Sequence, residues 1–442
     1  SKVSNNFGNG AILKILKFIL DFNYNLPKFV GAKIVEFNKY KSLTMALDII
    51  NYLSDNAKSM RRSAIRDLLN VANRPEIISF GGGFPNAVTF PVDDLKEIMM
   101  ELMNEKPAQV LQYGSTEGSV ALRKQIAKKY ENEGVKVDIS NILITTASQQ
   151  ALDLISRIFI NPGDTVLCGL PSYLGALQAI WSYQGRPVGI RHDEEAEAVV
   201  SALCAVGQKP KFIYAIPDFQ NPTGVTMDVK RRQEIIDVAR KHDLIIIEDS
   251  PYKELRYEGE SYPTMYSMAP ERVVLLGTFS KTFVPGFRLG WVLAPKEIID
   301  RLIVAKQSAD LCTPIFNQEV AARYMEKGYY EKNLQKTIDL YRHKRDLMHK
   351  YLTEYMPKGV TWTRPDGGLF LLLTMPEGLD ARDLFDIAIK ENVAFVIGEV
   401  FFCDGKGQNT LRLNFSYVSD EDMLEGVKRL ANAIVKLMET KK

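Results

Sequence analysis

Short apolar runs alternate with helical stretches through the middle of this chain, from about residue 141 to residue 281. The apolar runs are continuous and rich in β-branched residues. Strands that are buried on both faces read in this way, and their alternation with helices is typical of a parallel sheet. The pattern therefore predicts an α/β fold, with a mostly parallel central sheet between layers of helices. The segments are NILITTASQQALDLISRIF, DTVLCGLPSY, KFIYAIPDFQNPTG, DLIIIEDSPY and RVVLLGTFSK.

The segments outside this pattern predict a smaller unit and an N-terminal arm. Long helical stretches from about residue 322 precede the strand-like runs GGLFLLLTM and TLRLNFSY, and together they predict a small α+β domain. A chain of 442 residues is long enough for two or three domains. We expect a large domain over residues 92–321, a small domain over 322–442, and a segment over 45–91 that joins the small domain.

The first 44 residues form an extension whose role the sequence leaves open. Its apolar run GAILKILKFIL is broken by Lys14 and Lys17 and is too short to span a bilayer. Two interpretations remain: an amphipathic helix on a membrane surface, or an appended and weakly ordered segment. Met45 begins MALDIINYLSDNAKSM and reads as a natural start.

The composition favours small-molecule chemistry in the cytoplasm. The 56 basic and 54 acidic residues give a net charge of +2, which supplies no field for nucleic acid or an anionic membrane. The four cysteines are scattered and form no C-x-x-C pair, which fits a reducing compartment. With four histidines and no H-E-x-x-H motif, a metal site has no support.

Lys281 stands at a position where a lysine can do covalent chemistry. It follows a predicted buried strand and Ser280, and ligands of open α/β sheets bind beyond the carboxyl ends of the strands. A lysine amine held close to a carbonyl forms a Schiff base, and pyridoxal phosphate is the common partner. Most lysines are solvated surface residues, so this hypothesis depends on the groups that accompany Lys281.

Two acidic residues and a tyrosine follow another predicted strand. Glu248 and Asp249 end the run DLIIIED, where one carboxylate could keep a pyridinium nitrogen protonated. Tyr252 follows three residues after Asp249, and its phenol could hydrogen-bond the 3-oxygen of the cofactor. The competing interpretation is that the carboxylates are caps or members of ion pairs.

A phosphate could be held at the start of the helix after Thr146. Backbone N–H groups and the positive end of a helix dipole face such a turn. An N-cap role for the serine in this turn is the competing interpretation. The candidate phosphate ligands are Ser148, Gln149, Thr278, Ser280 and Arg288.

Arg412 is a candidate clamp for the carboxylate of an amino acid. It lies in the apolar, strand-like run TLRLNF, where an unpaired guanidinium would be costly. A planar guanidinium binds a carboxylate through two parallel hydrogen bonds. A structural salt bridge explains the same residue equally well.

Together these residues resemble the class I and II aminotransferases of fold type I, which use pyridoxal phosphate, over most of the chain. The resemblance implies that Lys281 in TFSK binds the cofactor covalently and that Asp249 in EDSPY contacts the pyridine nitrogen. It implies that Asn221 in QNPTG donates to the 3-oxygen beside Tyr252. It also implies that Tyr173 in PSY stacks on the pyridine ring.

Within this family the chain resembles the kynurenine/2-aminoadipate aminotransferase group, in RRSAIRDLL, ISFGGGFPN, LQYGSTEG, TASQQALDLI and LRLNFS. This resemblance implies a homodimer, in which Tyr113 reaches the phosphate of the neighbouring subunit, and it places Gly83 beside the substrate carboxylate. Two departures stand out. The spacing from Lys281 to Arg288 is one residue shorter than in aspartate aminotransferases, and Ser250 replaces a second acid.

The resemblance implies a ping-pong transfer of an amino group to a 2-oxo acid such as 2-oxoglutarate. The donors would be aromatic, kynurenine-type or 2-aminoadipate-type amino acids, with Arg412, Gly83 and Asn221 at the substrate. A carbon-sulfur β-lyase on the same fold and an aminotransferase-like transcription regulator are the alternatives. The fold does not decide the donor, because its pocket draws on the N-terminal segment. The candidate pocket residues are Arg61, Arg62, Ile65 and Tyr113.

Overall fold

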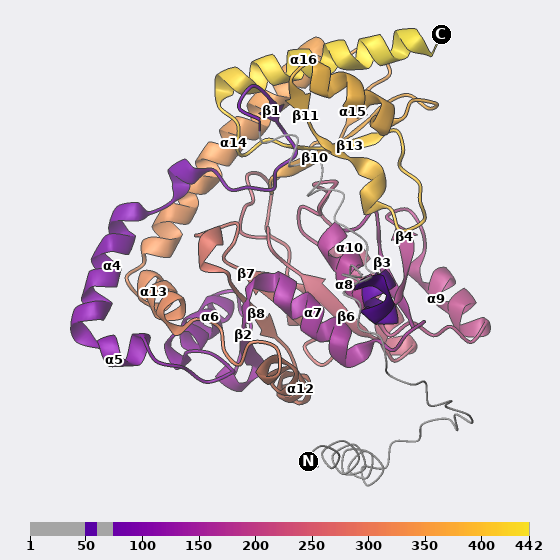
Figure 1. The fold of residues 1–442 in the computed structure, drawn as a ribbon. Helices are drawn as coiled ribbons and strands as arrows, with labels where there is room; N and C mark the ends of the chain where they lie inside the picture. The colour runs from indigo at the N-terminus through magenta and orange to yellow at the C-terminus, as the bar shows by residue number, and fades with distance from the viewer. Residues whose placement is uncertain (1–48, 60–73, 442) are drawn as a thin grey trace, which may run out of the picture. The chain divides into compact units, whose positions relative to one another are not determined.

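The computed structural model describes residues 49–59 and 74–441, and its fold is shown in Figure 1. The predicted extension over residues 1–44, Met45 and the candidate pocket residues Arg61, Arg62 and Ile65 lie outside the described residues. The chain from Leu53 onward forms one compact unit. Everything below concerns this unit.

A seven-stranded sheet forms the centre of the fold, as predicted. Six of its strands run parallel to one another, and only β8 runs the other way, because it pairs antiparallel with both of its neighbours. In spatial order the strands are β2 (Ile142–Thr146), β8 (Leu289–Leu293), β7 (Val273–Thr278), β6 (Ile245–Asp249), β5 (Phe212–Ala215), β3 (Thr165–Leu170) and β4 (Arg186–Arg191).

Both faces of this sheet are buried, which explains the continuous apolar runs. Side chains alternate along a strand, so Ile246 and Ile247 of β6 belong to cores on opposite faces. One core includes side chains of α7 (Ala147–Phe159), α8 (Leu174–Ser182) and α12 (Lys296–Gln307). The other includes side chains of α4 (Val92–Glu105), α6 (Val120–Asn132), α9 (Ala196–Ala205), α10 (Val229–Lys241) and α13 (Ile315–Glu326).

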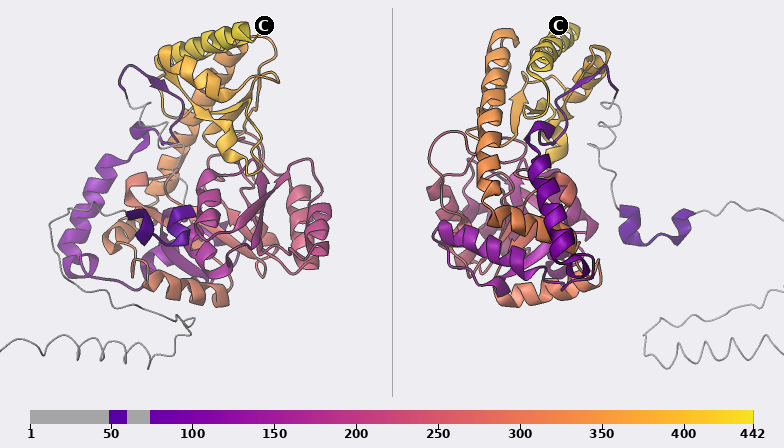
Figure 2. Two further views of the ribbon diagram at one scale, coloured as in Figure 1. Left: turned by 45° about the vertical axis from the view of Figure 1, so that its right-hand side comes forward. Right: turned by 90° about the vertical axis from the view of Figure 1, so that its left-hand side faces the viewer.

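A four-stranded antiparallel sheet makes up the C-terminal part of the chain. Its order is β12 (Val396–Ile397), β13 (Thr410–Asn414), β10 (Phe370–Thr374) and β9 (Thr361–Trp362). Helices α15 (Ala381–Lys390) and α16 (Asp420–Thr440) accompany it. The long helix α14 (Tyr329–Tyr355) runs from beside α13 to this C-terminal part (Figure 2). The boundary at residues 321/322 stays a prediction, and α13 spans it.

The segment directly before α4 pairs with the C-terminal part through residues 78–80, while the predicted bounds 45–91 stay a prediction. Its strand β1 (Ile78–Ser79) pairs parallel with β11 (Val393–Ala394). Phe80 continues this pairing, and its carbonyl accepts a 2.8 Å hydrogen bond from the Asn414 backbone N–H. The shorter described elements are η1 (Ile49–Tyr52), α2 (Asp55–Ser59), η2 (Ala87–Thr89), α5 (Pro107–Val110), η3 (Ile139–Asn141), α11 (Met265–Met268), η4 (Pro285–Phe287) and η5 (Gly398–Phe401).

Candidate active site

The candidate residues gather at one edge of the central sheet. The parallel strands end at this edge, and because β8 runs the other way, Arg288 at its start lies there too. Asp249 ends β6 and Thr278 ends β7, and seven further candidates follow strand ends by a few residues. Ligands of such sheets bind at this edge. The candidates after strand ends are Ser148, Gln149, Tyr173, Asn221, Tyr252, Ser280 and Lys281.

Lys281 follows β7, and its amine points toward the N-terminal segment. The Nζ atom donates a 2.8 Å hydrogen bond to the backbone carbonyl of Gly83. Burial, together with the positive charges of Arg412 and Arg288, lowers the pKa of this amine to about 8. The neutral, nucleophilic form of Lys281 is therefore accessible near neutral pH.

Asp249 is the fully buried acid of the site. Its Oδ2 accepts a 2.8 Å hydrogen bond from the hydroxyl of Tyr214, a β5 residue that the sequence analysis missed. Its Oδ1 is buried without a hydrogen-bond partner among the described residues. Burial raises the pKa of Asp249 to about 7, and the Tyr214 bond opposes that rise. Glu248 points elsewhere, because its two oxygens accept from the backbone N–H groups of Met265 and Tyr266.

Arg412 of β13 reaches the site from the four-stranded sheet. Its guanidinium donates to Asn221 Oδ1 at 3.0 Å and to the Gly81 carbonyl at 2.7 Å. It lies 4.1 Å above the centre of the Phe370 ring and 5.2 Å from that of Phe401. Its Nε has no partner among the described residues.

No acidic side chain of the described residues forms an ion pair with Arg412, so the salt-bridge interpretation fails there. The side chain is only 3% exposed, and burial lowers its pKa to about 10. A buried cation without a carboxylate is unfavourable unless an anion joins it. The arrangement fits a clamp for a substrate carboxylate.

Tyr252 and Tyr173 lie close enough to Asp249 and Arg412 to feel both charges, and Asn221 accepts from Arg412. The Tyr252 hydroxyl interacts with Asn221, and burial raises its pKa well above the usual range. The Tyr173 hydroxyl donates to Gln149 Oε1 at 3.3 Å. Burial also raises the pKa of Tyr173, and the nearby charge of Asp249 adds to the rise.

The predicted phosphate ligands lie around the start of α7 and the turn before β8. Arg288 is exposed and donates to Ser280 Oγ at 3.5 Å, while Thr278 Oγ1 donates to Ser280 Oγ at 3.0 Å. Ser148 is the second residue of α7 and not its N-cap, since Thr146 holds that place without a side-chain cap bond. Arg288 thus faces a helix start whose N–H groups favour an anion.

Gly290 allows β8 to pass close to this helix start. A Cβ at this position would lie 2.7 Å from the Ala147 carbonyl carbon and 2.8 Å from the Ser148 nitrogen. Any side chain here would displace the turn. Gln149, in contrast, is exposed and donates to the Gly175 carbonyl at 3.0 Å, so its amide is committed to α8.

Two further residues that the resemblance implies, Gly83 and Tyr113, lie outside the strand ends of the central sheet. A Cβ at Gly83 would approach the Phe370 ring to 3.3 Å. Tyr113 is 80% exposed in the loop after α5. Its side chain is therefore free to contact another molecule.

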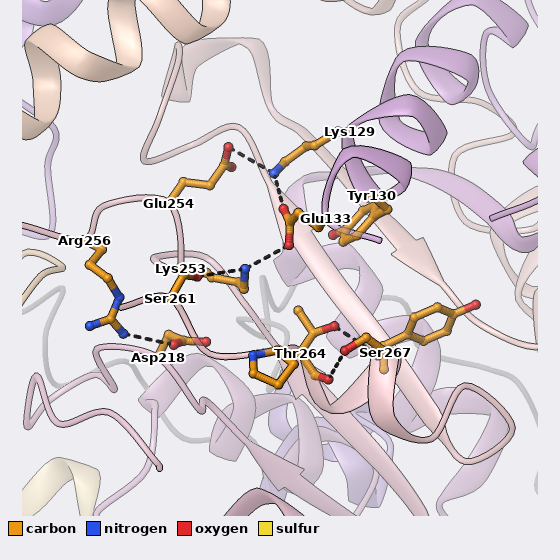
Figure 3. Close-up of polar contacts among 12 residues, drawn as sticks. Lys129, Tyr130, Glu133, Asp218, Lys253, Glu254, Arg256, Ser261, Thr264 and Ser267 are labelled. Atoms are coloured by element: carbon orange, nitrogen blue, oxygen red, sulfur yellow. Dashed lines mark hydrogen bonds and ion pairs between the residues drawn. The ribbon is translucent and has the colours of Figure 1, made fainter. Parts of the chain in front are cut away.

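A network of ion pairs connects α6 to the loop that follows Asp249. Lys129 of α6 pairs with Glu254 at 3.0 Å and with Glu133 at 3.2 Å, and Lys253 pairs with Glu133 at 2.8 Å (Figure 3). Tyr330 then joins Glu254 to Thr282, the neighbour of Lys281. The network ties the Tyr252 loop and the Lys281 turn to the same helices.

The site fits pyridoxal phosphate in three independent respects. Lys281 and Arg412 are buried cations, with Arg288 close by, and the described residues give none of the three a carboxylate partner. Asp249 Oδ1 is a buried acceptor without a donor, which suits a pyridine N–H. The start of α7 suits a phosphate. A molecule with a phosphate, a protonated ring nitrogen and a carbonyl carbon would provide a partner for the start of α7, for Asp249 Oδ1 and for Lys281.

Comparison with known proteins agrees with this chemistry. The family model for aminotransferase class I and II matches residues 76–430. The aromatic-amino-acid aminotransferase 1 of Thermococcus litoralis is 45% identical over 90% of this chain and 97% of its own length. The 2-aminoadipate transaminase of Thermus thermophilus is 38% identical over 86% and 96%. A crystal structure of Pyrococcus horikoshii kynurenine aminotransferase, 42% identical, superimposes with a TM-score of 0.85 over 89% of this chain and 99% of that one.

The chain belongs to the class I and II aminotransferases. It is a pyridoxal-phosphate-dependent amino-acid aminotransferase with the fold type I architecture that its sequence predicted. None of the described helices is long and apolar enough to cross a membrane.

The protonation of Asp249 predicts a pH effect on stability in the cofactor-free protein. Its pKa is about 7 when folded and about 4 when unfolded, so between these values the folded protein holds a proton that the unfolded chain releases. This contribution to the free energy of unfolding is complete below about pH 4 and lost as the pH rises through 7. Asp249→Asn should remove it.

Urea unfolding at several pH values measures this effect. Wild type should lose a few kcal/mol more than Asp249→Asn between about pH 4 and pH 8. Asp93→Asn, on the exposed side of α4, should behave like wild type. Equal slopes for wild type and Asp249→Asn would contradict the raised pKa.

Proposed function

We propose that this enzyme transfers amino groups from aromatic, kynurenine-type or 2-aminoadipate-type amino acids to 2-oxo acids such as 2-oxoglutarate. The names of the similar proteins from Thermococcus litoralis, Thermus thermophilus and Pyrococcus horikoshii support this range of donors. The observation that carries the assignment of roles is the desolvated Lys281 amine, which feels the charges of Arg412 and Arg288, together with the buried Asp249 at the end of the neighbouring strand β6.

When bound, pyridoxal phosphate supplies a ring that withdraws electrons and makes the proton on the α-carbon of an amino acid removable. Lys281 takes that proton, because its lowered pKa leaves a neutral amine available near neutral pH. The protonated amine of Lys281 would then be the acid that gives the proton back to complete the transfer. Asp249 accepts the pyridine N–H through its free Oδ1.

The remaining residues bind and orient. Ser148, Thr278, Ser280 and Arg288 hold the phosphate, with Gln149 fixing the start of α7 to α8 through Gly175. Asn221 and Tyr252 hold the 3-oxygen, and Tyr173 covers the ring. Arg412 binds the α-carboxylate, and Gly83 leaves room for it. The 2-oxo acid product leaves before the second 2-oxo acid enters, so ping-pong kinetics follow.

Replacing Lys281 tests the central role. Lys281→Ala should lower the rate of amino transfer from kynurenine to 2-oxoglutarate by several orders of magnitude, each tenfold step being about 1.4 kcal/mol of barrier. Lys296→Ala, an exposed lysine of α12, is the matched control and should keep full activity. Near-normal turnover of Lys281→Ala would exclude the lysine as the proton carrier.

Replacing Arg412 tests the carboxylate clamp. Arg412→Gln should raise the KM for amino-acid donors by about 100-fold, because the substrate carboxylate loses a buried charge-assisted partner. The exposed Arg382→Gln serves as control, since among the described residues Arg382 pairs only with Glu399. A KM that does not change in Arg412→Gln would remove this residue from the clamp.

We further propose a homodimer in which Tyr113 reaches the phosphate of the neighbouring subunit, in the cytoplasm. The 80% exposure of this tyrosine supports a contact with a second copy, and four free thiols suit a reducing compartment. Sedimentation velocity should give twice the chain mass of 49.9 kDa. In the dimer, Tyr113→Phe should weaken retention of pyridoxal phosphate during dialysis, and a monomeric mass would contradict the proposal.

A further inference from the structure

Two cysteines that are far apart in the sequence meet beside the active site. Cys168 lies in β3 and is 1% exposed, and its thiol donates to the Val188 carbonyl of β4 at 3.7 Å. Cys403 follows η5 by two residues and is half-buried. Its thiol interacts with the Cys168 thiol and with the backbone of Gly189, the β4 residue paired with Cys168.

The elements that carry these two thiols already touch. The Ser172 backbone N–H, four residues after Cys168, donates to the Phe401 carbonyl at 2.8 Å. Phe401 also packs with Leu174 at the start of α8. The loop over 398–407 therefore lies on the turn that carries Tyr173.

The two thiols differ in pKa and in solvent access. The pKa of Cys403 is lowered, chiefly by its interaction with the Cys168 thiol, while the pKa of Cys168 is raised by the same interaction and by burial. Cys403 is thus the thiol that ionises first and the one with some solvent access. Cys168 is placed to complete a bond with it.

We propose that Cys168 and Cys403 form a reversible disulfide modification site that regulates this aminotransferase. With hydrogen peroxide as oxidant, the Cys403 thiolate attacks one peroxide oxygen, becomes a sulfenic acid and releases water after protonation. The Cys168 sulfur then attacks the Cys403 sulfur, and the sulfenic hydroxyl leaves as a second water. Two thiols are oxidised to one disulfide, and one peroxide is reduced to two waters.

The cross-link acts on the site through Phe401 and Arg412. Arg412 is 3% exposed and lies 5.2 Å from the Phe401 ring, so Phe401 is part of its cover and a movement of Phe401 would open Arg412 to a substrate carboxylate. A Cys168–Cys403 bond would hold the 398–407 loop against β3 and restrict this movement. The effect on activity rests on the proposed role of Arg412, whereas the modification itself does not.

Peroxide treatment of the reduced full-length protein tests the proposal. We expect an intact mass lower by two hydrogens and a non-reducing peptide map that joins the Cys168 and Cys403 peptides. Turnover should fall about tenfold, because movement at a cover limits substrate entry, and it should recover with a thiol reductant.

The variant Cys403→Ser should keep its basal activity, form no cross-link and resist peroxide. Cys204→Ser, which removes a distant thiol, should respond like wild type. A peptide map without the Cys168–Cys403 link would overturn the modification. This result does not depend on the catalytic activity of the protein. An unchanged rate in the cross-linked protein, or equal inactivation of Cys403→Ser, overturns the regulation.

Discussion

The structure depends on cations kept out of water at the carboxyl edge of a buried parallel sheet. Arg412 is enclosed by Phe370, Phe401 and backbone carbonyls, and no carboxylate among the described residues compensates its charge. Such a group destabilises the empty protein, since desolvation of a charge costs several kcal/mol. Because no carboxylate neutralises this guanidinium and water is excluded from it, its attraction for an anionic ligand is not weakened by solvent. Stability and binding therefore oppose each other at this edge.

The rest of the fold holds this unfavourable arrangement in place. Tyr214 orients Asp249, and Asn221 orients Arg412, while Asp249 Oδ1 and Arg412 Nε stay buried without a partner among the described residues. Outside the site, Lys129 and Glu254 fix the loop that follows β6 to α6. These contacts make the geometry rigid, and rigid dipoles and charges are what stabilise developing charge without reorganisation.

The two sheets contribute different parts of one site. The central sheet supplies Lys281 and Asp249, whereas the four-stranded sheet supplies Arg412 and, through the loop after β12, Phe401. The N-terminal segment connects them, since Gly81 accepts from Arg412 and Gly83 accepts from Lys281. The candidate site therefore joins elements more than 300 residues apart in sequence, and the proposed covalent tie at Cys168 and Cys403 would connect the same two sheets.

The sequence by itself determined the α/β class and the strand-end motifs, because burial on both faces leaves continuous apolar runs and polar residues stand out against them. The signals of α16 are also local: Ser419 caps the helix, and apolar residues at helical spacing from Met423 to Leu437 are buried. Only the tertiary structure decided that Arg412 lacks an acidic partner, that Tyr214 serves Asp249, and that Cys168 meets Cys403. Those facts depend on pairings between distant strands, which local patterns of hydrophobicity do not encode.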